Sequence, residues 1–385
     1  MLGASGPSAH IAAKLGGYDR PVAGGELTAL IEQLVRIDSV NPSLIEDAAG
    51  EREISRFVAG WASDRGLEVE LVGGGERPSV IVTARGSGGG RSLMLNGHLD
   101  TVGVAGMDAP LEPRILEGRL YGRGTYDMKG AVAAILDAAA SARELGLRGD
   151  VLVTAVADEE VASIGTEAVL EHVRADAAIV VEPTELKVAA AHKGFAGFEI
   201  EAAGVAAHGS RPHLGVDAIA KMGPILVALS ELDRRLQSGE RHPLLGTGSV
   251  HASLIEGGQE FSSYPARCLL TGERRTLPGE THAEIEQELR AITRDAALRM
   301  LVAREPFEVD PEHELVQLVR RCAGNPETVG VSFWADSALI AAAGIPTVLY
   351  GPVGDGAHAV EEWVDLSSVE KTRDVVLAVA SEWCA

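Results

Sequence analysis

Residues 151–160 read VLVTAVADEE, an almost wholly apolar run that ends in three consecutive acidic side chains. Such a run is typical of a strand that is buried on both faces, as in a parallel sheet covered by helices. Residues 177–181 read AAIVV and repeat the pattern, and alanine-rich segments with helical character, 130–145 and 165–174, precede the two runs. Because strands and helices alternate with short glycine-containing joints, we expect an α/β sheet with helices on both faces.

The character of the sequence changes after about residue 192. Segments of strand and helix character then follow in the order β-α-β-β-α, with the last helix expected over residues 282–300. This order is compatible with a small two-layer α+β sandwich. Alternation of α and β segments returns towards the C-terminus. We therefore predict a discontinuous catalytic domain, residues 1–191 and 304–385, built on a mixed sheet flanked by helices, with a smaller domain inserted at residues 192–303.

The composition is that of an ordinary soluble globular protein. Of the 385 residues, 46% are hydrophobic and 23% are charged, and the net charge is −22. Phosphate contacts need clustered Lys and Arg, so this excess of acid argues against nucleic acid as a partner. A membrane partner is not expected either, since no apolar run approaches the roughly 18 residues that span a bilayer.

The cysteines indicate a reduced protein. Cys268, Cys322 and Cys384 lie far apart and form no Cys-x-x-Cys pair, so neither a disulfide framework nor a thiolate zinc site is indicated. Reduced thiols are typical of cytosolic proteins. The first residues, MLGASGP, lack the basic flank and apolar centre of a secretory signal. We therefore expect a cytoplasmic protein.

Five short segments carry histidine or carboxylate side chains that could meet in space. They are HLD (98–100), YDMKG (126–130), DEE (158–160), VEP (181–183) and GAH (356–358). Four of the five follow predicted strands, and ligands of open α/β sheets gather beyond the carboxyl ends of the strands. Together they supply two imidazoles, three candidate carboxylate ligands, an orienting carboxylate and a spare glutamate. This inventory suits a two-metal hydrolase that splits amide bonds.

The spacing of these residues allows distinct roles. His98 and Asp100 are two apart on a strand and share a face, so the carboxylate can accept a hydrogen bond from the ring nitrogen that is not on a metal. Asp127, in a glycine-flanked loop, can bridge two cations. Glu159 and Glu160 are adjacent and point different ways, so one can bind metal while the other stays free for proton transfer.

Glu182 and His358 complete the set. Glu182 emerges where a buried strand ends, and an uncompensated buried carboxylate is costly, so a cation or a cap is expected there. His358 lies in a glycine-rich loop that can approach a ligand closely. Taken singly, each candidate is more often a helix cap, a solvated acid or a surface histidine. Imidazole and carboxylate without thiolate suit zinc first, with cobalt or manganese as alternatives.

The order of these motifs resembles a family of zinc metallopeptidases and deacylases. The family includes acetylornithine deacetylase, succinyl-diaminopimelate desuccinylase, aminoacylase and glutamate carboxypeptidase, and the resemblance spans nearly the whole chain. It implies two zinc ions, one held by His98 and Glu182 and the other by Glu160 and His358, with Asp127 as the bridge between them.

The resemblance also implies roles for the neighbours of these ligands. Asp100 would orient His98, and Glu159 would be the general acid and base. The peptide bond between Asp127 and Met128 would be cis.

The inserted segment resembles the lid and dimerisation domain of that family. His208 would reach the active site of the partner in a homodimer and stabilise the oxyanion. Arg275 would grip the substrate carboxylate with its guanidinium fork. Ser262 stands where many members carry Asn, and Gly209 where they carry Ser; both departures touch substrate contacts, so the resemblance names no substrate. Asp336 matches a segment near the cleft, where we expect a supporting role.

We therefore predict a dizinc amidohydrolase that acts on an N-acyl amino acid or a short peptide with a free carboxylate. Glu159 takes a proton from a metal-bridging water that attacks the acyl carbon, and passes it to the leaving amine. A carboxypeptidase or dipeptidase of the same family is the alternative. A catalytically silent binding protein and a mononuclear aminopeptidase-like enzyme are more distant ones. The acidity of the chain favours a cationic or neutral substrate.

Overall fold

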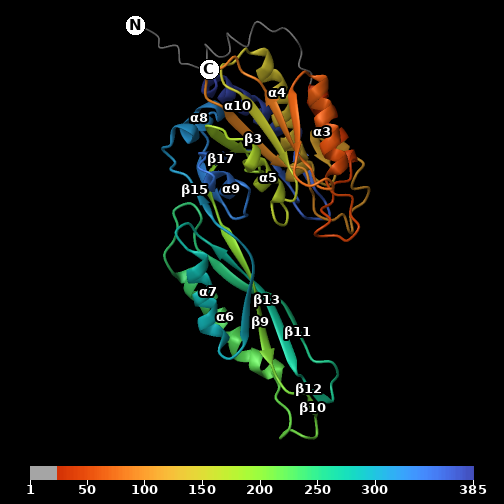
Figure 1. Ribbon diagram of the computed structural model, residues 1–385, viewed down its shortest axis with the longest axis vertical. Helices are drawn as coiled ribbons and strands as arrows, with labels where there is room; N and C mark the ends of the chain where they lie inside the picture. Colours follow the sequence, from red (N-terminus) through yellow and green to blue (C-terminus); the bar gives the residue numbers. More distant parts are fainter. Residues whose placement is uncertain (1–23) are drawn as a thin grey trace.

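The structure is a computed structural model that describes residues 24–385. Figure 1 shows a broad body of mixed α and β structure above and an elongated body below. The expectation about a secretory signal falls on the first residues and lies outside the described part of the chain. Among the helices of residues 24–385, none has the length and apolar character that crossing a bilayer requires.

A nine-stranded sheet forms the centre of the upper body, in the order β1-β2-β6-β3-β7-β17-β8-β15, with β16 paired to β8. The four central neighbours β6, β3, β7 and β17 run parallel, and antiparallel pairs flank them. The predicted mixed sheet is therefore confirmed. The strands are β1 (Glu68–Val72), β2 (Ser79–Ala84), β3 (Leu93–His98), β6 (Val151–Val156), β7 (Ala177–Val180), β8 (Val188–His192), β15 (Phe307–Glu308), β16 (Thr328–Val331) and β17 (Thr347–Leu349).

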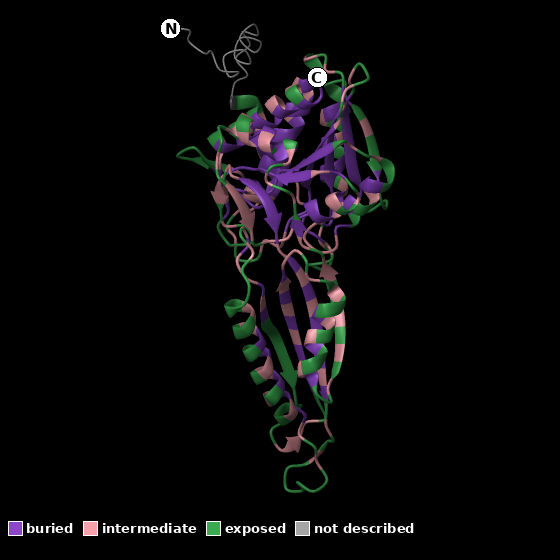
Figure 2. Cartoon of the chain, turned by 90° about the vertical axis from the view of Figure 1, so that its left-hand side faces the viewer, coloured by how far each residue is buried: buried purple, intermediate pink, exposed green. Residues whose placement is uncertain are grey.

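Helices cover both faces of this sheet because successive strand residues point to opposite sides. Leu93 and Leu95 of β3 pack in the core beneath one set of helices, whereas Met94 packs in the core on the other side. The first set is α2 (Gly24–Arg36), α3 (Arg52–Asp64), α4 (Gly130–Glu144), α8 (Glu314–Ala323) and α10 (Leu366–Trp383). The second is α5 (Ile164–His172) and α9 (Ser337–Ala342). The central strands are buried throughout, which explains their apolar sequences (Figure 2).

The upper body also contains a second, small sheet in the order β18-β19-β5-β4. Its strands are β4 (Arg114–Leu116), β5 (Arg119–Tyr121), β18 (Gly354–Asp355) and β19 (Trp363–Asp365). Trp363 of β19 pairs with Tyr121 of β5, so two segments that are far apart in sequence run side by side here.

The lower body has two layers, a four-stranded antiparallel sheet and two helices (Figure 1). The sheet order is β11-β13-β9-β14, and Phe198, Ile200 and Leu270 pack beneath the helices. A two-stranded ribbon, β10 with β12, forms the far tip. The elements are β9 (Gly194–Ala203), β10 (Ala207–His208), α6 (Ala218–Ser238), β11 (Ser249–Gly257), β12 (Ser263–Tyr264), β13 (Arg267–Thr276), α7 (His282–Thr293) and β14 (Ala297–Arg304).

The helix predicted over residues 282–300 is wrong in its second half. Helix α7 ends at Thr293, after which Arg294 has a φ of 57°, a conformation that cannot continue a right-handed helix. Residues 297–304 instead form β14, which pairs antiparallel with β9. Backbone hydrogen bonds to β9 thus determine the structure of this segment. With β14 included, the sheet and helices of the lower body follow the order β-α-β-β-α-β.

Candidate metal centre

The parallel strands bring four of the five predicted segments to one edge of the large sheet. His98 is the last residue of β3, Glu160 follows β6, and Glu182 follows β7, while His358 lies beyond β17, in the turn between β18 and β19. These four strands are neighbours and run in the same direction, so their carboxyl ends meet at that edge. This is the edge at which open α/β sheets collect ligand-binding side chains.

The fifth segment enters through a tight irregular turn before α4. The peptide bond between Asp127 and Met128 is cis, as the resemblance implies. Gly124 precedes this turn with a φ of 78°, and a Cβ atom there would lie 2.8 Å from Cγ2 of Thr101. Both the backbone angle and the space therefore require glycine, and the turn presents the Asp127 carboxylate to the edge of the sheet.

The Asp127 carboxylate lies between the two histidines. Its Oδ1 is 2.9 Å from Nε2 of His98, and its Oδ2 is 3.3 Å from Nε2 of His358. Glu182 Oε1 lies 3.9 Å from the same nitrogen of His98, and Glu160 Oε2 lies 3.0 Å from that of His358. The five side chains thus form two imidazole–carboxylate pairs, one on each side of a shared aspartate.

Asp100 is buried beneath this cluster and differs from expectation in how it contacts His98. The atom nearest to Nδ1 of His98 is the main-chain carbonyl oxygen of Asp100, at 2.9 Å, whereas the carboxylate lies 3.6 Å away. The carboxylate accepts hydrogen bonds from Nδ2 of Asn41 (2.8 Å) and from the main-chain N–H groups of Glu159 (3.1 Å) and Glu160 (3.2 Å). Asp100 therefore fixes the turn that carries both glutamates.

The pKa values of the cluster are shifted because several carboxylates lie close together and are shielded from water. Burial and the charge of Glu182 raise the pKa of Glu159 well above its usual range, and burial and nearby carboxylates do the same for Glu182. Hydrogen bonds to Asp127 and Glu160 raise the pKa of His358 to about 10. Burial disfavours the ionised Asp127, but hydrogen bonds from both histidines outweigh it and lower its pKa. Repulsion of this kind is relieved by a bound cation.

The donor atoms fit a metal ion. In two overlapping triplets, His98–Glu159–Glu182 and His98–Asp127–Glu160, one imidazole nitrogen and two carboxylate oxygens lie within 4.8 Å of one another. Mixed nitrogen and oxygen donors without thiolate suit zinc and related divalent cations.

The three remaining candidates, His208, Ser262 and Arg275, belong to the lower body. His208 and Ser262 lie together at the tip, where the N–H of Gly209 donates to the Ser262 carbonyl oxygen at 2.7 Å (Figure 1). Arg275 lies near the opposite end of the sheet, on β13 beside Phe195, and its Nε donates to Oε1 of Glu273 at 2.6 Å. The structure thus brings the metal-ligand candidates together and leaves His208 and Ser262 far from them.

Asp336 is buried close to the cluster. Its Oδ2 accepts a hydrogen bond from Oγ1 of Thr166 at 2.5 Å, and burial raises its pKa to about 6.

Three further residues contact the segments of the centre, although the sequence alone assigns them no role. They are Asn41, Arg123 and Glu362.

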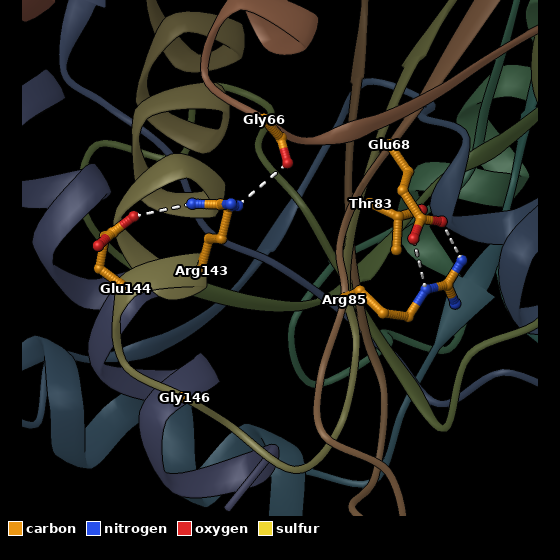
Figure 3. A pocket seen from close by; sticks show the side chains of 7 residues that line it. All are labelled: Gly66, Glu68, Thr83, Arg85, Arg143, Glu144 and Gly146. Carbon is orange, nitrogen blue, oxygen red and sulfur yellow. Dashed lines mark hydrogen bonds and ion pairs between the residues drawn. The ribbon is translucent and has the colours of Figure 1, made fainter.

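A separate surface cavity of about 480 Å³ lies at the other edge of the large sheet (Figure 3). Ala84, next to Arg85 of its lining, pairs with Val151 at the start of β6, away from the end that carries the acids. Its two arginines already have partners: Arg85 pairs with Glu68 and Asp150, and Arg143 donates to the Gly66 carbonyl oxygen and pairs with Glu144. The cavity therefore offers no spare charge for a ligand.

An α/β sheet that gathers imidazole and carboxylate donors at the carboxyl ends of its parallel strands describes a class of metal-dependent hydrolases. Residues 94–382 match the sequence profile of Peptidase family M20/M25/M40, and the chain belongs to this family. The family that the motifs predict is thereby confirmed. The protein is an enzyme, a metal-dependent hydrolase of amide bonds.

Known relatives and structures agree with this assignment. Acetylornithine deacetylase from Erwinia tasmaniensis is 30% identical, with 92% of this chain and 97% of that protein covered. Acetylornithine deacetylase from Myxococcus xanthus is 31% identical, with 93% and 97% covered. Aminopeptidase PepT from Bacillus cereus has a TM-score of 0.77 at 20% identity, with 95% and 100% covered. Bacillus subtilis YXEP, a dinuclear metal-binding peptidase of the M20 family, has a TM-score of 0.72 at 16% identity, with 94% and 98% covered. At these identities the two structures establish the fold alone.

Proposed function

We propose that the enzyme is a dizinc deacylase that releases an amino acid from an N-acyl amino acid, in the manner of acetylornithine deacetylase. The observation that carries the proposal is the shared aspartate, since each oxygen of Asp127 faces a different histidine. A carboxylate in that position can bridge two cations about 3.5–4 Å apart.

The ligand set follows from these pairs. His98 and Glu182 would hold one ion, Glu160 and His358 the other, and Asp127 both. Zinc bound there would act as a Lewis acid and lower the pKa of a water molecule towards about 7.

Glu159 is the proposed general base. It lies next to Glu160, and one of its carboxylate oxygens lies within 4.8 Å of donor atoms of His98 and Glu182. Burial and repulsion from Glu182 raise its pKa, so it readily takes a proton. It would accept the proton of the attacking water and deliver it to the nitrogen of the leaving amine.

A second copy of the chain would supply His208 as the oxyanion donor, and we propose a homodimer. Within one chain His208 is exposed at the tip of the lower body, far from the metal-ligand candidates. Edge strand β11 and the neighbouring helix α6 expose apolar side chains, including Leu254 (65% exposed), Ile255 and Val227. An open edge beside apolar surface favours association with another copy. We accordingly propose residues 192–303 as the lid and dimerisation domain, and residues 1–191 and 304–385 as the catalytic domain.

Arg275 is the proposed anchor for the carboxylate of the substrate. Its side chain is about one-third exposed and its guanidinium hydrogen-bonds Glu273, so the group is oriented and still accessible. Ser262 would contact substrate bound in the partner.

We further propose the cytoplasm as the compartment, in keeping with three cysteines that form no disulfide.

A substrate panel tests the proposal. The metal-loaded enzyme would be assayed with N-acetyl, N-succinyl and N-carbamoyl amino acids and with dipeptides, varying the side chain in each series. We expect the highest kcat/KM for an N-acyl amino acid with a cationic or neutral side chain. Faster hydrolysis of dipeptides would instead assign a dipeptidase or carboxypeptidase activity.

A further inference from the structure

The side chain of Glu362 is buried and accepts four hydrogen bonds. Its Oε2 accepts from Nη1 of Arg123 (2.7 Å) and from the N–H of Gly124 (2.9 Å). Its Oε1 accepts from the N–H groups of Tyr126 (2.9 Å) and Asp127 (3.1 Å). All four donors belong to the short segment that ends in the shared aspartate, so one carboxylate fixes the main chain of that segment.

Arg123 extends this connection to the loop that carries His358. Only 3% of Arg123 is exposed, and its Nη2 donates to the carbonyl oxygens of Ala359 (2.8 Å) and Gly103 (3.1 Å). Ala359 is the residue directly after His358. The pairing of β5 with β19 joins the chain just before Arg123 to the chain just after Glu362.

These contacts join the two sides of the metal centre. Asp127 is fixed by direct hydrogen bonds to Glu362, and the main chain beside His358 is fixed through Arg123. Buried carboxylates that accept several donors hold their partners firmly, because each donor left without an acceptor would lose a hydrogen bond that water cannot replace. Neither side chain reaches the cluster itself, so neither is a candidate ligand.

We propose that Glu362 is a positioning residue of the metal centre, which sets the distance between Asp127 and His358 with Arg123 as its link to the second loop. The inference rests on the proposed dinuclear function. A carboxylate that binds no metal would thus keep the bridging aspartate and one histidine at a fixed distance. Partners of this kind typically change metal affinity by about 10–100-fold when they are replaced.

A role in fold stability alone is the competing explanation, and the chain offers a matched control. Asp137 of α4 pairs with Nη1 of Arg373 in α10 at 2.8 Å, and both side chains are largely buried. This pair also joins segments that are far apart in sequence, but it contacts none of the metal-ligand candidates. Asp137→Asn should therefore lower stability without changing metal affinity.

The experiment compares Glu362→Gln with Asp137→Asn and the unchanged enzyme. Each protein is stripped of metal, titrated with Co²⁺ and followed by calorimetry and visible absorption, and urea unfolding of the metal-free protein measures its stability. In Glu362→Gln an amide N–H₂ replaces one acceptor oxygen and faces N–H donors. We expect both Co²⁺ ions to bind about 10–100-fold more weakly, because Asp127 is common to both sites. In Asp137→Asn we expect a lower unfolding midpoint and the affinities of the unchanged enzyme.

Arg123→Met provides a second test and separates the two loops. It leaves the main-chain donors to Glu362 in place and removes the bond to Ala359, so the ion that His358 holds should be weakened more than the other. If Glu362→Gln does not fold without metal, this variant carries the test. Unchanged affinity for both ions in the folded variants would overturn the inference. Fewer than two Co²⁺ ions per chain in the unchanged enzyme would instead contradict the proposed function.

Discussion

His192 should make the enzyme sensitive to mild acid. It is the last residue of β8, at the joint between the two bodies, and it is fully buried against Phe307, with ring centroids 5.3 Å apart, and Trp334, at 6.1 Å. One ring nitrogen, Nδ1, hydrogen-bonds the Lys193 carbonyl oxygen at 2.9 Å, and within the described residues Nε2 has no partner. Burial lowers the pKa of His192 from 6.5 to about 4.

The sign and size of the effect follow from this shift. At pH 5 His192 is mostly protonated in the unfolded chain and mostly neutral in the folded one, so unfolding takes up a proton. The free energy of unfolding therefore has its full value above about pH 6.5, where His192 is neutral in both states. It falls as the pH drops towards 4, because only the unfolded chain takes up the proton. Between pH 7.5 and pH 5 the loss amounts to roughly 2 kcal/mol in the free energy of unfolding.

Urea unfolding of the metal-free enzyme and of His192→Phe at the two pH values measures this loss. Phenylalanine keeps an aromatic ring between its neighbours and cannot be protonated. Other groups titrate in both proteins and cancel in the comparison. The unchanged enzyme should lose about 2 kcal/mol more than the variant on going from pH 7.5 to pH 5. Equal losses would show that His192 gains its proton in the folded state without penalty, and would refute the reasoning.

Three further predictions concern activity. Glu159→Gln should lower kcat by about 10²–10⁴ while the enzyme keeps its metal, as rate measurements together with metal analysis would show. His208→Ala should be nearly inactive alone, but mixing it with Glu159→Gln under conditions of subunit exchange should restore activity, since one site of each mixed dimer is then complete. Arg275→Ala should raise KM more than it lowers kcat, and Arg275→Lys should do so less, which steady-state kinetics would show.

Each of these has an outcome that contradicts it. Near-normal hydrolysis by Glu159→Gln would remove Glu159 as the base. Failure of the mixed dimers to recover activity, with exchange verified by mass spectrometry, would exclude action of His208 across the dimer. An unchanged KM in Arg275→Ala would place the substrate carboxylate elsewhere.

The sequence predicts the large sheet and the cluster at its edge because both have local signals. An apolar run ending in acids marks a buried strand and its carboxyl end, and β6 (Val151–Val156) lies within the run of residues 151–160. The topological rule then places the ends of parallel strands together without knowledge of any contact. His98, Asp127, Glu160, Glu182 and His358 could be grouped in this way although up to 260 positions separate them in the printed sequence.

The remainder depends on contacts that leave no local trace. Glu361 and Glu362 are adjacent and identical, yet the first is exposed and the second is buried under donors more than two hundred residues away. Likewise, the sequence does not reveal that the carbonyl oxygen of Asp100 lies nearest to His98, while its carboxylate accepts hydrogen bonds from Asn41 and the turn after β6. The sequence does not predict strand β14, because the helical spacing of α7 continues into it and only the pairing with β9 distinguishes strand from helix.

An anomalous-scattering crystal structure of the zinc-loaded enzyme tests the central claim most directly. Two zinc peaks about 3.5–4 Å apart are predicted, one beside His98 and Glu182, the other beside Glu160 and His358, with one oxygen of Asp127 directed at each. A single peak, or zinc bound away from Asp127, would contradict the account.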